Sequence, residues 1–124
     1  MASGFPFSTG NVLSATNMNG LTAFTVNADA TADYTAVLAD QYQALISMNK
    51  ATAVAFKIPT NASVAFAVGT VITVLNKGAG AVTISAVTSG TTTVLSAGAV
   101  AASPTLAQYK SAACIKTATD TWYV

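Results

Sequence analysis

Long uncharged segments built from Ala, Val, Thr and Ser dominate this sequence and limit what it can fold into. Of its 124 residues, 52% are hydrophobic and only 7% are charged, whereas about a quarter of the residues of a typical globular protein are charged. Val, Ile, Thr and aromatic residues favour β-strands, where they pack well on a pleated surface. The composition therefore predicts an all-β chain, and the length fits one domain.

Turn residues divide most of the chain into segments of strand length. In residues 82–86 (VTISA) hydrophobic and polar residues alternate, which is typical of a strand with one buried face. In residues 71–75 (VITVL) only Thr73 is polar, so we expect both faces of that strand to be covered. Many short strands at regular spacing favour a single antiparallel β-sandwich or a barrel-like domain. The expected strands are 34–39, 44–48, 53–58, 64–66, 70–75, 81–87, 92–95, 111–117 and 121–124.

The first 33 residues differ from the rest, and we expect them to form an N-terminal arm and linker ahead of a β domain over 34–124. Residues 14–21 (SATNMNGL) have the pattern of a short helical turn, because Ser14 can cap its start and Gly20 can end it. Residues 27–33 (NADATAD) read as a polar linker. The apolar side chains of the arm cannot form a core alone, so we expect them to anchor it in a neighbouring protein; they are Val12, Leu13, Met18 and Leu21.

The low charge has a consequence for solubility. Residues 70–75 (TVITVL) are apolar, uncharged and β-prone, and such segments aggregate when they lie on an open edge. Thr, Ser, Asn and Gly interrupt every apolar run, so no membrane-spanning helix is expected. The first ten residues also lack the basic and apolar regions of a secretion signal. The remaining ways to cover the strands are closure of the sheet and association of several copies.

The residue types exclude most catalytic chemistry. The sequence has no His, Glu or Arg, so Ser-His and Cys-His nucleophiles are impossible, and acid–base pairs would have to come from four aspartates. Cys114 lies in an apolar run and is expected to be buried and inert. The net charge is +1 without a basic run, so a nucleic-acid partner is not expected. We therefore predict a protein that is not an enzyme, with no cofactor and no metal.

Three short strings resemble functional motifs, but each lacks parts that its motif requires. Residues 47–50 (SMNK) match a Ser-x-x-Lys nucleophile motif, but the helix and the companion motifs of that active site are missing. Residues 78–80 (GAG) lack the third glycine of a dinucleotide loop and read as a hairpin turn. Residues 27–29 (NAD) lack the Gly and Glu of a calcium loop.

The exposed aromatic residues leave two interpretations open. Aromatic side chains dominate protein cores and subunit interfaces, and they also stack on sugars. Trp122 and Tyr123 alternate in a terminal strand, so at least one of them is expected to point inward. The residues considered for an interface or a glycan site are Tyr34, Tyr42, Tyr109, Trp122 and Tyr123.

Two stretches resemble structural proteins of tailed bacteriophages. Residues 7–21 (FSTGNVLSATNMNGL) are similar to an opening that is common in such proteins. Residues 58–74 (IPTNASVAFAVGTVITV), continued by 76–84 (NKGAGAVTI), by Tyr109, by Ile115-Lys116 and by Asp120-Thr121-Trp122, resemble a β-rich domain of phage tail fibres and other virion proteins. Ala67 stands where relatives often have Pro, and Gln41 interrupts a turn of small residues. The resemblance implies a trimeric, non-enzymatic virion component.

The expected function is therefore that of a phage structural protein on the particle surface. It would be a capsid decoration or cement protein, or a short fibre subunit, and it would pack as a homotrimer against other virion proteins of the capsid or tail. A host-glycan-binding, adhesin-like module of a tail fibre is the alternative, and a membrane-active β protein is a more distant one. The sequence does not decide between the capsid and the tail.

Overall fold

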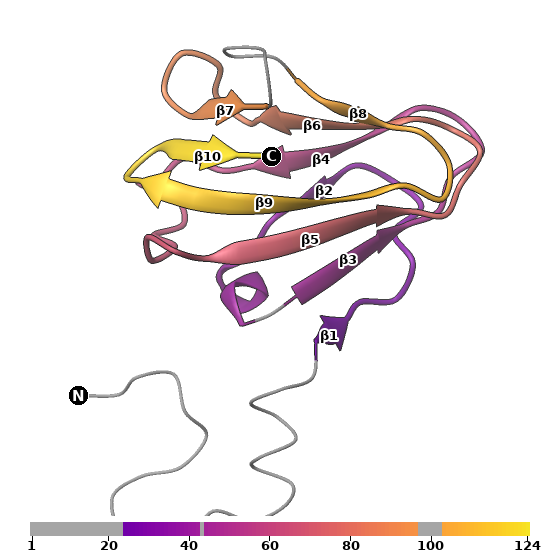
Figure 1. Ribbon diagram of the computed structural model, residues 1–124, viewed down its shortest axis with the longest axis horizontal. Coiled ribbons are helices and arrows are strands. Elements are labelled where there is room, and N and C mark those ends of the chain that lie inside the picture. Colours follow the sequence, from indigo (N-terminus) through magenta and orange to yellow (C-terminus); the bar gives the residue numbers. More distant parts are fainter. Residues whose placement is uncertain (1–23, 43, 97–102) are drawn as a thin grey trace, which may run out of the picture.

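The computed structural model describes residues 24–42, 44–96 and 103–124, which form two sheets around one core (Figure 1). The larger sheet has six strands in the order β1-β3-β5-β9-β10-β7, and the smaller has four in the order β2-β4-β6-β8. The strands are β1 (Thr25–Val26), β2 (Tyr34–Thr35), β3 (Ala44–Met48), β4 (Val54–Ile58), β5 (Val71–Asn76), β6 (Val82–Ala86), β7 (Thr93–Leu95), β8 (Thr105–Leu106), β9 (Ser111–Ala118) and β10 (Thr121–Tyr123). A 3-10 helix, η1 (Leu38–Gln41), joins β2 to β3. The predicted all-β class is confirmed.

The expected antiparallel arrangement is not what the two sheets contain. Five of the eight pairings between these strands are parallel and three are antiparallel. From β1 to β6 the chain crosses to the opposite sheet after every strand, so strands that follow each other within a sheet run in the same direction. Strand alternation in a sequence specifies which side chains are buried. It does not specify the direction of the neighbouring strand.

Because of these crossings the chain winds in successive layers, which we call coils. Each coil has one strand in the six-stranded sheet and one in the four-stranded sheet. The coil of β3 and β4 lies beside the coil of β5 and β6, and the partner in the second coil is 28 positions further on in both sheets, from Leu45 to Thr73 and from Val54 to Val82. Backbone hydrogen bonds continue between the turns of these coils: the Lys77 amide donates to the Met48 carbonyl over 2.8 Å. The sequence interpretation of residues 78–80 as a hairpin turn is therefore wrong, because this turn connects two different sheets.

The core lies between the two sheets and follows the alternation of each strand. In β6, Val82 and Ile84 are fully buried while Thr83 and Ser85 are partly exposed. Trp122 of β10 is buried and packs edge-on against Phe66, with 5.5 Å between the ring centroids. The core is formed by Ala36, Ala44, Ile46, Met48, Val54, Phe56, Ile58, Phe66, Ile72, Val74, Val82, Ile84, Val94, Leu106, Cys114 and Trp122.

Several predicted strand positions differ from the observed ones. The expected strand 34–39 is only β2, because Asp40 ends it by accepting a 2.8 Å hydrogen bond from the Val37 amide as η1 begins. Residues 64–66 are not a strand, although Phe66 is buried. The short strands β1 and β8 were not predicted, since two residues give no visible alternation.

Part of the expected linker belongs to the larger sheet. β1 pairs with β3, and the Ala30 amide donates to the Ser47 carbonyl over 2.8 Å. The Asn27 side chain accepts a 2.6 Å hydrogen bond from the Ser47 amide. The arm residues Val12, Leu13, Met18 and Leu21 lie outside the described residues.

Candidate functional site

Apart from the Asp29–Lys77 ion pair beside Ser47, where β3 and β5 end, the outer face of the six-stranded sheet is made of side chains without charge. Its residues alternate along each strand with the buried core residues, and the strand registers place them in rows across the sheet. We call this surface the uncharged face; its residues are Val26, Leu45, Ser47, Val71, Thr73, Leu75, Thr93, Leu95, Ser111, Ala113, Ile115, Thr117, Thr121 and Tyr123.

One row of this face is apolar across four strands. Val71 of β5 pairs with Ile115 of β9, which pairs with Tyr123 of β10, which pairs with Leu95 of β7. Val71, Ile115 and Tyr123 are 38%, 40% and 49% exposed. Large apolar side chains that are contiguous and exposed mark interaction sites on soluble proteins. The row therefore makes this face a candidate interaction surface.

The apolar surface continues onto the connections where β3 and β5 begin. Leu38 lies in η1, which contacts β5, and Val68 lies in the loop that leads into β5. Both are at least half exposed, as are Tyr42 and Val87 in neighbouring connections. This end of the molecule has few exposed charges, because Asp40 is buried.

The outer face of the four-stranded sheet has a different character. Its outward side chains are short or polar, and it carries a lysine, Lys57, whose Nζ lies 2.9 Å from the Asp33 carboxylate. This ion pair and a hydrogen bond from the Ala55 amide lower the pKa of Asp33. The outward residues are Thr35, Ala55, Lys57, Thr83, Ser85 and Thr105.

A second ion pair joins three coils at the opposite end from η1. Lys77 lies 2.8 Å from the Asp29 carboxylate, which also accepts a 2.6 Å hydrogen bond from the Ser47 hydroxyl. The hydrogen bonds from Lys77 and Ser47 lower the pKa of Asp29. The Ser47 hydroxyl is thus used in a hydrogen bond to Asp29. Ser47 lies in strand β3, whereas a Ser-x-x-Lys nucleophile requires a helix.

Lys116 of β9 takes an inward position, so this strand adds no charge to the uncharged face. It is only 2% exposed. Its Nζ donates to the Asn61 side-chain oxygen over 2.6 Å and to the Phe66 carbonyl over 2.7 Å. Burial lowers the pKa of Lys116, and the nearby Asp120 opposes that change. The one lysine of this strand is therefore turned away from the surface and engaged in a structural role.

The aromatic residues singled out from the sequence do not form one site. Tyr34 stacks on Phe56 with 6.2 Å between the ring centroids, and its hydroxyl donates to Asp40 over 3.0 Å. Burial, followed by that hydrogen bond, raises the pKa of Tyr34 to about 12. Trp122 is buried in the core, in agreement with the expectation that at least one of Trp122 and Tyr123 points inward.

Besides Tyr42, which lies among the connections described above, two of these aromatics are exposed to a partner. Tyr123 lies on the uncharged face, whereas Tyr109 lies in the connection between β8 and β9 and is 76% exposed. The φ angle of Tyr109 is +63°, in the left-handed region that bulky residues rarely adopt. The two side chains belong to different parts of the surface, so they do not make one stacking platform.

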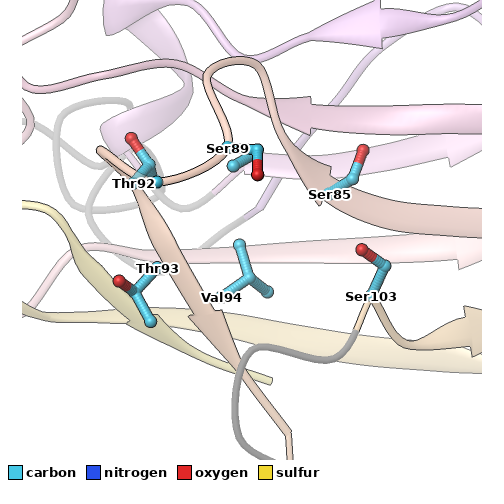
Figure 2. A pocket seen from close by; sticks show the side chains of 8 residues that line it. Ser85, Ser89, Thr92, Thr93, Val94 and Ser103 are labelled. Carbon is cyan, nitrogen blue, oxygen red and sulfur yellow. The ribbon is translucent and has the colours of Figure 1, made fainter.

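A cavity of about 290 Å³ opens between β6 and β7 (Figure 2). Among the described residues, its wall combines hydroxyls with small apolar groups and includes no charged or aromatic side chain. Such a wall can form hydrogen bonds to a polar molecule. The lining residues are Ser85, Ala86, Ser89, Gly90, Thr92, Thr93, Val94 and Ser103.

Within the described ranges, no cluster of three or more His, Cys, Asp or Glu residues is close enough to bind a metal ion. Over the same ranges, no helix is long and apolar enough to cross a membrane. Comparison of the chain with protein-family models, with curated proteins and with solved structures found no match.

The uncharged face was missed in the sequence because its members are far apart in the chain. Val71, Ile115 and Tyr123 become neighbours only through the registers of β5, β9 and β10. A local signal did exist in β9, where Ala113, Ile115 and Thr117 alternate with Cys114 and Lys116. The charge of Lys116 conceals this alternation, since a lysine is normally expected on the exposed side of a strand.

Proposed function

We propose that this chain is a non-enzymatic structural protein of a tailed-bacteriophage particle, either a capsid decoration or cement protein or a short fibre subunit. It works in many copies at the particle surface, as a homotrimer that also contacts other virion proteins. The observation that carries the proposal is the uncharged face with its exposed row of Val71, Ile115 and Tyr123. The resemblance of residues 7–21, 58–74 and 76–84 to phage proteins is the reason for placing it in a phage particle.

The environment of the charged groups supports a structural role. Asp29 and Asp33 bind lysines, and Asp40 is buried beneath Tyr34. Asp120 accepts hydrogen bonds from the Asn61 amide over 2.8 Å and from the Thr92 hydroxyl over 3.2 Å. A general acid or base must reach a substrate with a proton to exchange. All four aspartates instead stabilise turns and strand ends.

Low surface charge suits a protein that is packed against others. Bringing a charged group into an interface requires the removal of its water, which costs several kcal/mol unless the charge is paired. Threonine, alanine and valine avoid most of that cost. A particle component that is held permanently by its neighbours gains from such a surface, whereas a freely diffusing monomer would depend on charge for its solubility.

The direct test is to locate the protein in the particle. Phage particles that encode this chain, with an epitope tag after Val124, would be purified on a density gradient and analysed by mass spectrometry and immunogold electron microscopy. Gold over the head supports a decoration protein, and gold over the tail supports a fibre subunit. Absence of the chain from purified particles, with presence in the lysate, would overturn the proposal.

Tyr109 favours a second candidate function, the binding of host glycan. It is the most exposed of the large hydrophobic side chains in the described residues, and its backbone conformation holds the ring outward from a tight turn. Aromatic rings stack on the apolar faces of sugars by the same contacts that make them frequent at interfaces. A glycan array with the wild type and with Tyr109→Ala tests this function, since a hit that is lost in the variant supports it. No binding to any glycan would reject it.

A further inference from the structure

We propose that Lys116 and Asn61 join in an isopeptide bond within the chain, formed by the protein's own residues. Lys116 lies in β9, and Asn61 lies in the connection between β4 and β5, 55 positions earlier in the sequence. The Lys116 Nζ donates a 2.6 Å hydrogen bond to the side-chain oxygen of Asn61. The fold therefore places an amine directly against a side-chain amide of the same chain.

The two atoms that would react are close to bonding distance. Asn61 Cγ is one C=O bond, about 1.2 Å, beyond the oxygen that Nζ contacts. The Lys116 Nζ therefore lies within about 3.8 Å of Cγ. Reacting atoms that are held for attack lie about 3–3.5 Å apart. A shift of the amine by less than about 1 Å closes the difference.

Contacts with neighbouring residues hold both partners in place. Lys116 is the register partner of the buried Trp122 in β10, and its Nζ also donates to the Phe66 carbonyl over 2.7 Å. The Asn61 backbone amide donates to the Asp120 carboxylate over 2.8 Å. Holding two groups in this way makes their reaction effectively unimolecular, which removes much of its entropic barrier.

The surroundings of Lys116 favour the neutral amine, which is the form that attacks a carbonyl carbon. Burial lowers the pKa of Lys116, and the charge of Asp120 acts in the opposite direction. Among the described residues, two acceptors lie within hydrogen-bond distance of Nζ, the Asn61 oxygen and the Phe66 carbonyl. Two acceptors satisfy both N–H groups of a neutral amine and leave its lone pair free, whereas an ammonium group has three N–H to satisfy.

The reaction exchanges one amide nitrogen for another. The Nζ lone pair attacks Asn61 Cγ, and the electron pair of the C=O bond moves onto the oxygen. When the carbonyl forms again, the bond from Cγ to Nδ2 breaks. One Nζ proton leaves with Nδ2, so the products are a Lys116–Asn61 amide and one ammonia, without oxidation or reduction. The new amide joins β9 covalently to the connection between β4 and β5.

Asp120 is the carboxylate beside this pair. It accepts the Asn61 backbone amide, and among the described acidic residues it is the one whose charge acts on Lys116. It is therefore the group that can carry the Nζ proton to the leaving nitrogen. A positioned group that transfers a proton accelerates such a step by about 100-fold or more. The substrate in this case is the protein's own chain.

The two lysines in ion pairs lack this environment and serve as controls within the same molecule. The side chain of Lys57, paired with Asp33, is 37% exposed, and that of Lys77, paired with Asp29, is 46% exposed. An exposed ammonium group paired with a carboxylate has no free lone pair and does not attack. A bond at either of these pairs would also release water and not ammonia.

The mass of the purified wild type is the first test. Mass spectrometry of the denatured protein should give the sequence mass less one ammonia. Cyclisation of Asn61 onto its own backbone also releases ammonia, so tryptic peptides must locate the bond. We expect residues 58–77 to be linked to residues 111–124, with no cleavage after Lys116. A wild type of full sequence mass, or an ammonia loss confined to residues 58–77, overturns the proposal.

Two variants test the bonded residues, with a third as their control. Lys116→Arg keeps a cation that donates hydrogen bonds, but its guanidinium stays protonated and does not attack. Asn61→Ala removes the amide. Both should have their full sequence mass, whereas Lys110→Arg, at an exposed position, should still lose ammonia. Circular dichroism would show which variants fold. An ammonia loss retained in folded Lys116→Arg overturns the proposal, and the wild-type peptide map decides it if neither variant folds.

Asp120→Asn tests the proton transfer separately. The variant keeps an oxygen that can accept the Asn61 backbone amide, but it cannot carry a proton. Mass spectrometry after a short pulse of synthesis would follow the linked fraction, which should rise about 100-fold more slowly than in the wild type. A wild-type rate in the folded variant would overturn the role given to Asp120.

Discussion

Gly78 lies directly against the backbone of Lys50, which is 28 positions earlier in the chain: a Cβ at position 78 would overlap the Lys50 carbonyl oxygen and amide nitrogen. Gly80 has the same relationship to Thr52, at the same spacing. This spacing is also that of the paired strands on either side of the turn. The two glycines allow successive turns to stack as closely as the strands do.

Gly78→Ala should therefore destabilise the fold by about 1–3 kcal/mol, because overpacking against backbone cannot be relieved by a change of rotamer. The free energy of unfolding would be measured by urea denaturation. Ala79→Ser is the matched control, since Ala79 is exposed in the same turn, and its effect should stay within about 0.5 kcal/mol. Equal stability of Gly78→Ala and wild type would show that the turns are less closely stacked.

Stability should fall in acid through Asp29 and Asp33. Their folded-state pKa values are lowered below the ordinary 3.8 by hydrogen bonds from Lys77 and Lys57. Their contribution is present above about pH 4 and is lost as the pH falls through the folded-state pKa. Urea midpoints between about pH 7 and about pH 2 should decline less steeply in the Asp29→Asn/Asp33→Asn variant than in the wild type. Parallel curves would contradict this assignment.

Stability should also fall in alkali, through Tyr34 and Cys114. Burial raises the pKa of the Cys114 thiol from 9.0 to about 12, and burial with the Asp40 hydrogen bond raises the pKa of Tyr34 from 10.0 to about 12. A group whose pKa is higher in the folded state than in the unfolded state stabilises the fold fully below its unfolded-state pKa. That stability is lost as the pH rises toward the folded-state pKa.

The cysteine contribution should be on the order of 2–4 kcal/mol over this range. Circular dichroism melting at pH values from about 8 to about 11 would follow it. Cys114→Ala should be less stable than the wild type at neutral pH, but its stability should decline less with rising pH. An identical decline in both proteins would show that Cys114 does not titrate in this range.

Tyr109→Gly should stabilise the fold by about 0.5–1 kcal/mol. Tyr109 has a φ angle of +63°, a conformation that costs a bulky residue of order 1 kcal/mol and costs glycine almost nothing. Thermal unfolding would measure the gain, and Gln108→Gly, in the same turn, should lower stability. If Tyr109→Gly is more stable but binds its partner or a glycan less well, then the tyrosine side chain contributes to that binding. A destabilised one would show that the ring packs on the protein.

Removal of residues 1–23 should leave a folded protein with an unchanged core, because the two sheets and the core cluster lie within the described residues. The cut must not extend to residue 27, since β1 pairs with β3 and Asn27 binds Ser47. We expect the shortened protein to melt within a few degrees of the full chain. In particles we expect it to be depleted, since Val12, Leu13, Met18 and Leu21 are proposed to anchor the arm. Incorporation at the normal level would refute that role.

Much of the strand content could be predicted, because burial leaves a local signal. The expected strand 44–48 coincides with β3, and 111–117 differs from β9 by one residue. The direction of the strands could not be predicted, because alternation records only which face a side chain occupies. The candidate surface was also out of reach, since it joins Val71 to Ile115 across long-range pairing.

The constant spacing of 28 residues between the two stacked coils gives the molecule a direction in which it can grow. A duplicated unit of that length would add one layer, about 4.8 Å thick, with every inward and outward side chain in its former place. An insertion of an odd number of residues within a strand would move every following side chain of that strand to the opposite face. The height of this protein is therefore adjustable by gene duplication in whole layers, without a new fold.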